Sequence, residues 1–321
     1  MGEDEMRGIT YVLCLVVVTW LTLGGVSPLS AQWTQGRVRT AGNSVLSLWI
    51  SPNGSAGSNV FARTGESGVF VSTDDGTNWV AVDSGLTDFT VCSLAVPGTY
   101  IFAGTYGGDV FRSTDQGAHW TRIGLENTWG AGLAFSGAYP FAGTWCRGLF
   151  YSTDLGTSWD YEYGLSAVSV LLVSGSGILA GTDGGVYLSK DDSTNYFQLN
   201  SGPTWNGIVE SFATSGGIVY AGTYGRGVFY SADDGSTWNA VESGLTDSDV
   251  TSFAVFDTVL FAGTDGGGVY LLSGDGSSWV PEATDLGNSH VNALTVIGGY
   301  LVAGTNGGGM WRRPLAQMII G

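Results

Sequence analysis

The residues of this chain that could do chemistry gather in one short stretch, AGTYGGDVFRSTDQGAHW, at residues 103–120. It places a threonine, two aspartates and a histidine beside glycine-rich turns, a set that could serve acid–base chemistry or hold a cation. Nearly the same stretch returns as FAGTWCRGLFYSTDLGTSW at residues 141–159 and as AGTYGRGVFYSADDGSTW at residues 221–238. A catalytic centre is rarely written several times in one chain, so the repeated part indicates a scaffold.

The centre of this stretch is the motif S-x-D-x-G-x-x-W. It is complete in four copies: Ser72/Asp74/Gly76/Trp79, Ser113/Asp115/Gly117/Trp120, Ser152/Asp154/Gly156/Trp159 and Ser231/Asp233/Gly235/Trp238. A fifth copy decays to Ser189/Asp191/Ser193/Tyr196, and in the sixth unit Asp275 is out of phase. We predict that Asp and Ser brace a turn between two strands, that Gly supplies a positive φ, and that Trp packs the outer edge.

Calcium binding is the alternative reading of the motif. A Ca²⁺ ion takes about six to eight oxygens, and each motif offers few side-chain oxygens. No other metal-ligand spacing occurs, and His119 and His290 have no partner visible in the sequence. We therefore expect no metal and no other cofactor.

The whole chain repeats with this motif. Threonines that follow Gly or Arg recur at steps of 38 to 41 residues: Thr64, Thr105, Thr144, Thr182, Thr223, Thr264 and Thr305. Each unit holds short apolar segments of period near two, bounded by Gly, Asp, Ser or Asn, which indicates four strands per unit. The predicted fold is all-β, a seven-bladed β-propeller with one four-stranded blade per repeat.

The two ends of the chain are predicted to meet. The last repeat stops one strand short, while AQWTQGRV near the N-terminus places Trp33 as Trp79 stands in its own repeat. We expect this N-terminal strand to complete the last blade and to close the ring, which covers an otherwise open sheet edge.

The first 31 residues are predicted to be a secretory signal peptide, leaving residues 32–321 as the propeller. An apolar run from Ile9 to about Val26 ends at Pro28 and the small residue Ala31. A permanent membrane anchor is the alternative, but helix breakers cut the run short. The acidic residues that follow Met1 leave Met6 open as the true start.

The charge of the chain excludes one class of partner. Its formal net charge is −17, with a single lysine, so clustered cations for phosphate contacts are lacking and nucleic acid is not expected to bind. Two cysteines, Cys92 and Cys146, remain beyond the signal peptide, and their pairing is left open.

The motif resembles that of the Asp-box, or BNR-like, repeat propellers, and the resemblance covers residues 32 to 314. That group includes sialidases, sortilin-type ectodomains, glycoside hydrolases and photosystem assembly factors, so the resemblance implies a fold rather than a function. A sialidase would show an Arg-Ile-Pro motif and an arginine triad, and this sequence does not show that motif. The xyloglucanase-type hydrolases look like two propellers with acids at the cleft between them, whereas the repeats here predict one propeller. The resemblance to photosystem assembly factors would imply a basic patch, and this chain has little basic surface.

The repeats differ most in the turn after Gly-Thr and in the loop before each first strand, which we expect on one face. Aromatic or arginine residues stand out there: Tyr106, Trp129, Trp145, Arg147, Trp205, Tyr224 and Arg226. Aromatic rings on rigid loops stack on sugars or anchor peptides, although they can also simply cover a rim. We take these seven residues as the candidate ligand site and name no catalytic residue.

The function expected from the sequence is an exported, noncatalytic binding or scaffold propeller at or outside a bacterial cell surface, in the periplasm or secreted. Its expected partner is a glycan or an extracellular protein or peptide, and a monomer with no membrane span after signal cleavage is expected. The alternative is a carbohydrate-active hydrolase that uses acids of the same face, such as Asp109, Asp183 or Asp265.

Overall fold

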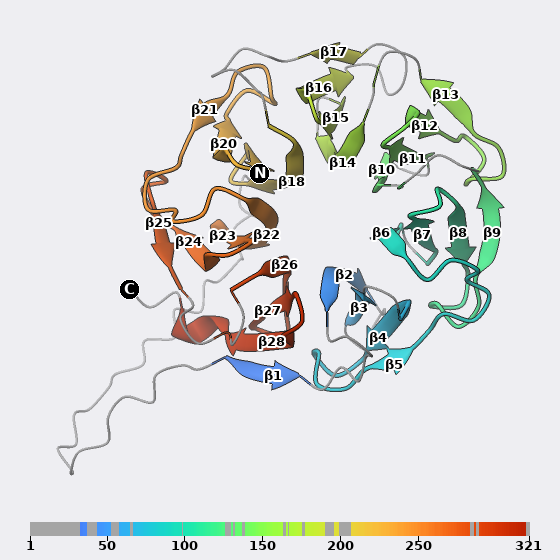
Figure 1. Ribbon diagram of the computed structural model, residues 1–321, viewed down its shortest axis with the longest axis horizontal. Coiled ribbons are helices and arrows are strands. Elements are labelled where there is room, and N and C mark those ends of the chain that lie inside the picture. The colour runs from blue at the N-terminus through green and yellow to red at the C-terminus, as the bar shows by residue number, and fades with distance from the viewer. Residues whose placement is uncertain are drawn as a thin grey trace, which may run out of the picture. The chain divides into compact units, whose positions relative to one another are not determined.

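A computed structural model describes residues 33–36, 44–52, 58–64, 67–97, 99–125, 130, 132–136, 139–162, 165, 167–174, 177–189, 196–198, 207–282, 286 and 289–318. These residues belong to the compact unit Ala31–Gly321. Seven four-stranded antiparallel sheets stand around a ring in this unit (Figure 1). The unit is a seven-bladed β-propeller, so the fold class predicted from the repeats is confirmed.

In blades one to six the strands run outward from the centre of the ring, one after another along the chain (Figure 1). The innermost strands are β2 (Val45–Pro52), β6 (Val91–Ala95), β10 (Gly132–Ser136), β14 (Val168–Ser174), β18 (Val209–Ser215), β22 (Val250–Phe256) and β26 (Val291–Ile297). The second strands are β3 (Ser58–Thr64), β7 (Ile101–Thr105), β11 (Tyr139–Thr144), β15 (Gly177–Thr182), β19 (Ile218–Thr223), β23 (Val259–Thr264) and β27 (Tyr300–Thr305).

The outer half of each blade carries the third and fourth strands. The third strands are β4 (Val69–Ser72), β8 (Val110–Ser113), β12 (Gly148–Tyr151), β16 (Gly185–Ser189), β20 (Gly227–Ser231), β24 (Gly268–Leu272) and β28 (Gly309–Pro314). The outermost strands are β5 (Val80–Ala81), β9 (Thr121–Gly124), β13 (Asp160–Glu162), β17 (Tyr196–Gln198), β21 (Asn239–Ala240), β25 (Trp279–Pro281) and β1 (Thr34–Gly36).

The N-terminal strand closes the ring, as predicted. Strand β1 pairs antiparallel with β28, with Thr34 opposite Arg312 and Gly36 opposite Met310, and so becomes the fourth strand of blade seven. Trp33 is only 4% exposed and lies in the core between blades six and seven. The short 3₁₀ helix η2 (Leu315–Gln317) follows β28 and adds Leu315 to that core.

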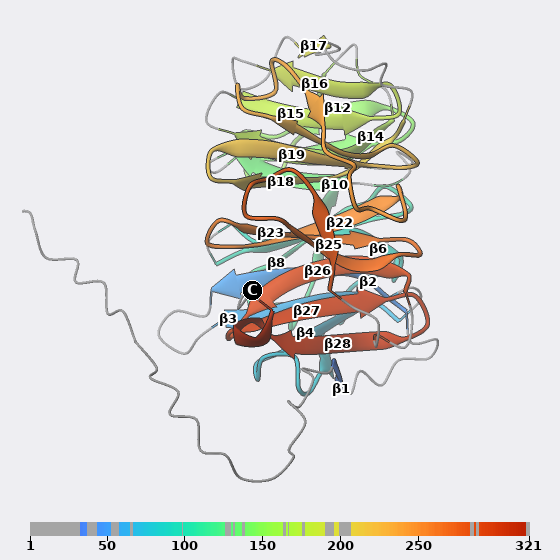
Figure 2. The ribbon, with the colours of Figure 1, turned by 90° about the vertical axis from the view of Figure 1, so that its left-hand side faces the viewer.

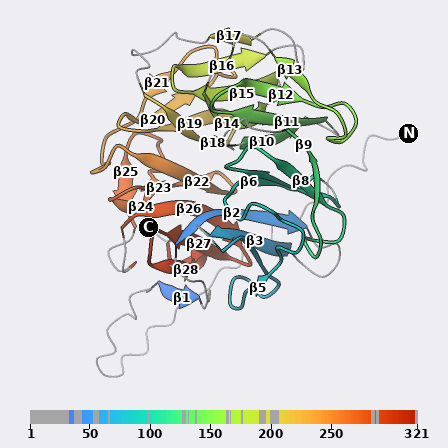
Figure 3. The same cartoon turned by 45° about the vertical axis from the view of Figure 1, so that its right-hand side comes forward.

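The core lies between blades rather than within them. Figure 2 shows from the side, and Figure 3 obliquely, how the sheets of successive blades stack against one another. Phe61 and Val69 of blade one pack with Leu94 and Phe111 of blade two, for example. Because both faces of a middle strand are covered in this way, every residue of β7 is buried.

The repeated threonine holds the turn between the second and third strands. Thr144 Oγ1 donates to the carbonyl of Gly148 at 2.9 Å, and Thr305 Oγ1 donates to that of Gly309 at 2.8 Å. The turn between each threonine and the glycine that accepts its hydrogen bond is therefore braced. This turn presents the side chains that lie between the two. None of the described helices is long and apolar enough to cross a membrane.

Candidate functional site

The Asp-box motif is a turn brace between the third and fourth strands, as predicted. In blade three the Ser152 hydroxyl donates to Asp154 Oδ1 at 2.8 Å and accepts from the Gly156 N–H at 2.8 Å. The other turn donors are the N–H and the hydroxyl of Ser158, each 2.7 Å from an oxygen of Asp154. Gly156 has φ 85°. These hydrogen bonds hold the pKa of Asp154 at about 2.

In blades two and six the tryptophan of this turn has a role that the sequence did not reveal, because it joins neighbouring blades. Trp120 Nε1 of blade two donates to the carbonyl of Val82 in blade one at 2.7 Å. Trp279 Nε1 of blade six donates to that of Val241 in blade five at 2.8 Å. Asp275, which the sequence placed out of phase, accepts from Ser273 at 2.6 Å. Blade six thus keeps the Ser–Asp pair although Asp275 is out of phase, because its turn is one residue shorter.

Replacing Asp154 with alanine should lower the melting temperature by about 2 to 4 °C, because several turn donors lose their acceptor. The pKa of Asp154 is depressed to about 2 from an ordinary 3.8, so its stabilisation is present above pH 4 and is lost toward pH 2. Thermal melts from neutral to acid pH check both statements. Thr153→Ala, an exposed change in the same turn, should have little effect, and equal shifts for the two variants would contradict the brace.

A cavity of about 840 Å³ lies where the innermost strands converge. Its wall comes from β2, β6, β10, β14, β18 and β22, together with turns of blades two and three. The face of the ring that carries the turns after the repeated threonines is called the turn face below. The loops that lead into the innermost strands lie on it too, since Tyr106 N–H donates to Thr90 O and Tyr224 N–H donates to Ile208 O.

The structure brings two of the seven candidate residues to this cavity. Tyr106 and Trp145 line it and are 54% and 49% exposed. Gly130 connects their turns: its N–H donates to Tyr106 O, and a Cβ at Gly130 would lie 2.9 Å from Trp145 Cδ1. Arg147, Tyr224 and Arg226 are exposed on the turn face but are not part of the cavity lining. Trp129 and Trp205, like the box residue Asp191, lie outside the described residues.

Arg63 is a lining residue that the sequence analysis did not select. It stands in Ala-Arg-Thr of blade one, where the other six repeats read Ala-Gly-Thr. The glycines allow close approach of the next blade: a Cβ at Gly143 would lie 2.4 Å from Val168 Cγ1, and one at Gly304 would lie 2.5 Å from Val45 Cγ1. A side chain at this position thus requires extra space between blades one and two.

The guanidinium of Arg63 is not paired with any described carboxylate. Its Nε is buried without a hydrogen-bond partner, and burial lowers the pKa of the side chain from its ordinary value. The Cys92 thiol, which also lines the cavity, acts on that pKa in the opposite direction. No disulfide joins Cys92 to Cys146, which answers the question of their pairing.

Glu210 is the second lining residue that sequence reasoning missed. It occupies the bulge of β18, where the register shifts between Val209 and Ser211. In blades four and six the bulge residues are Ser169 and Thr251, whose hydroxyls donate to a carbonyl of the next blade. An ionised carboxylate cannot donate, and in blade five Ser211 makes the equivalent bond, to Val250 O.

Glu210 therefore faces the cavity instead of tying two blades together. Its pKa is raised to about 7, first by burial and then by the negative charges of Asp249 and Asp265. The cavity wall thus carries a cationic side chain at blade one and an acidic side chain at blade five.

The acids of the hydrolase alternative are engaged elsewhere or exposed. Asp109 pairs with Arg122 at 2.6 Å, and Asp265 accepts from His290 Nδ1 at 2.8 Å. His119 likewise contacts Asp115 at 2.7 Å, so both histidines have partners that the sequence did not show. Asp183 is exposed, and among the described lining residues Glu210 is the one carboxylic acid. The described residues contain no group of three or more side chains that could hold a metal ion.

Solved structures resemble this chain in fold. The extracellular domain of a putative one-component system from B. thetaiotaomicron is 15% identical over 88% of this chain and 40% of that chain, with TM-score 0.71. A GH74 xyloglucanase from Xanthomonas campestris is 17% identical over 89% of this chain and 54% of that chain, with TM-score 0.72. YCF48 bound to D1 peptide is 14% identical over 91% of this chain and 99% of that chain, with TM-score 0.67.

The likeness is one of fold alone. This chain spans about two-fifths of the first of these proteins and about half of the xyloglucanase. No family model matches the chain, and no curated protein matches it. The proteins of similar fold include an extracellular domain of a putative one-component system, a xyloglucanase and a protein bound to a peptide, so the function has to be argued from the residues of the cavity.

Proposed function

We propose that this protein is an exported, noncatalytic binding propeller that recognises a glycan or an extracellular protein segment at its turn face. The observation that carries the proposal is the cavity on the ring axis, with the half-exposed rings of Tyr106 and Trp145 at its wall. A cavity of this size, largely apolar with a few polar groups, is typical of ligand sites. Large aromatic side chains with rigid backbones supply much of the affinity at such sites.

Export is supported by the predicted signal peptide over residues 1–31. Extracellular domains of bacterial sensor systems are among the proteins of similar fold, and YCF48 was solved with a peptide bound. A hydrolase needs a pair of acids about 5 to 10 Å apart, and the described lining contributes a single carboxyl group, that of Glu210. These observations favour binding over catalysis.

A combined glycan and peptide array screen, followed by titration of the strongest ligand, tests the proposal. Tyr106→Ala combined with Trp145→Ala should weaken binding about tenfold or more, because each buried ring contact contributes more than about 1 kcal/mol. The melting temperature should stay nearly unchanged, since both side chains are half exposed.

Tyr224→Ala is the matched control for this experiment. Tyr224 occupies the same turn position in blade five as Tyr106 does in blade two and is 55% exposed, but it does not line the cavity. Its removal should leave binding unchanged. If the double variant binds as well as the wild type, or Tyr224→Ala weakens binding equally, the ligand does not use this site.

A further inference from the structure

The central cavity has two walls of opposite charge, and they come from distant blades. Arg63 lies on β3 of blade one and Glu210 on β18 of blade five, two strands on well-separated sides of the ring (Figure 1). Trp49, Leu133 and Trp145 line the space with apolar and aromatic surface. A ligand that fits this space carries an anionic end, a cationic end and an apolar part.

Arg63 calls for a carboxylate because no described carboxylate forms an ion pair with it. Its Nε is buried with no hydrogen-bond partner, and among the described charges only the Cys92 thiol raises its pKa. A buried cation without a carboxylate partner is costly, and six of seven repeats avoid the cost by carrying glycine here. A planar guanidinium binds a carboxylate through two parallel hydrogen bonds, which makes a carboxylate the matching group.

Glu210 selects among carboxylate ligands. A simple anion would be repelled by Glu210 and by its neighbours Asp249 and Asp265, whereas an ammonium group would be attracted. A neutral sugar offers no charge to either wall. A uronic acid offers a carboxylate to Arg63 but no cation to Glu210. A short peptide with free ends satisfies both.

We propose that the central cavity binds a zwitterionic ligand of the short-peptide class, with its carboxylate on the guanidinium of Arg63 and its ammonium group toward Glu210. The proposal rests on the binding function proposed above and names the ligand class for the same site. Tyr106 and Trp145, on the turns of blades two and three, would contact the apolar part of the ligand.

Three versions of one tripeptide library test this on the unmodified protein: free ends, an amidated C-terminus and an acetylated N-terminus. Native mass spectrometry identifies retained peptides, and calorimetry measures their affinity. Amidation, which removes the carboxylate, should weaken binding about tenfold or more, and acetylation should also weaken it. Equal retention of free and amidated peptides, or retention of none at millimolar concentration, would overturn the proposal.

The chain itself supplies a substitution for Arg63 that the fold accommodates. Arg63→Gly restores the sequence of the other six repeats, so the variant should fold and lose about tenfold or more in affinity for free-ended peptides. Glu210→Gln should weaken the binding of free-ended peptides but not that of acetylated peptides. Glu242→Gln, an exposed change in the same blade as Glu210 and outside the lining, should change nothing.

Two further outcomes separate this inference from the function on which it rests. If an array ligand depends on Tyr106 and Trp145 but not on Arg63, the binding function stands and the ligand class is wrong. Digalacturonic acid serves as a second probe: Arg63-dependent binding of this sugar acid without any peptide binding would also contradict the class. If neither an array ligand nor a peptide binds, both proposals fail.

Discussion

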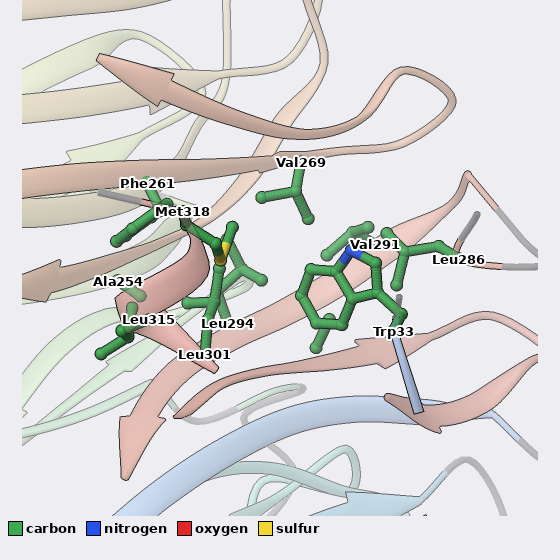
Figure 4. Packing of buried hydrophobic residues seen from close by; sticks show 11 residues of the cluster. Trp33, Ala254, Phe261, Val269, Leu286, Val291, Leu294, Leu301, Leu315 and Met318 are labelled. Atoms are coloured by element: carbon green, nitrogen blue, oxygen red, sulfur yellow. The ribbon is translucent and has the colours of Figure 1, made fainter. Parts of the chain in front are cut away.

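Replacing Trp33 with alanine is expected to lower the free energy of unfolding by about 3 to 5 kcal/mol, the range for a buried tryptophan. Figure 4 shows its ring packed among Val291, Leu286 and the other apolar residues of the cluster. The effect should exceed that of an ordinary core residue, because Trp33 directly precedes β1, the strand that covers the edge of blade seven. Denaturant titration followed by fluorescence or circular dichroism measures it.

Val80→Ala provides the comparison for Trp33. Val80 also belongs to an outermost strand, β5 of blade one, but it is 65% exposed, so its truncation should cost little. A free energy of unfolding that is the same in Trp33→Ala and in Val80→Ala would mean that the N-terminal segment contributes nothing to closure. Loss of cooperativity in the Trp33 variant alone would instead support opening of the ring at blade seven.

Replacing Glu210 with glutamine is expected to stabilise the protein in a pH-dependent way. The pKa of Glu210 is raised in the folded state to about 7 from an ordinary 4.5, so the folded protein disfavours the ionised carboxylate. The wild type therefore loses stability as the pH rises through this window, and the glutamine variant does not. After discounting for partial solvent screening, the variant should be more stable by about 2 kcal/mol at pH 8.

Urea titrations of both proteins between pH 4 and pH 8 measure the difference. Near pH 4 the two should be almost equally stable, because Glu210 is then mostly protonated in the folded and unfolded states. Glu242→Gln, at an exposed position of the same blade, controls for the substitution itself. A constant difference at all pH values would show that Glu210 acts through packing rather than through its charge.

The repeats and the box were predictable because their physics is local. Within one box, Ser152, Asp154, Gly156 and Ser158 make their hydrogen bonds to one another over a few residues. The order of residue types along the chain therefore predicts the turn, and the seven copies of the repeat predict the number of blades. The closing strand was predictable for the same reason, since Trp33 repeats the position of a box tryptophan.

The candidate site could be predicted only in part. The sequence directed attention to aromatic residues in variable turns, and it treated Tyr106 and Tyr224 alike because they occupy the same position of the repeat. Of these two tyrosines, only Tyr106 lines the cavity. Arg63 did leave a signal, as the one departure from Ala-Gly-Thr, but the signal could be interpreted only once those glycines were seen to face the next blade.

The number of blades, the bracing of their turns and the strand that closes the ring follow from the order of residues along the chain, because they depend on neighbours a few residues away or on a repeated pattern. The set of side chains that share the central cavity depends on how the blades are placed in space. Arg63 and Glu210 line the same cavity because closure of the ring brings blades one and five around it. The shifted pKa of Glu210 depends in the same way on Asp249 and Asp265, which approach it from other loops.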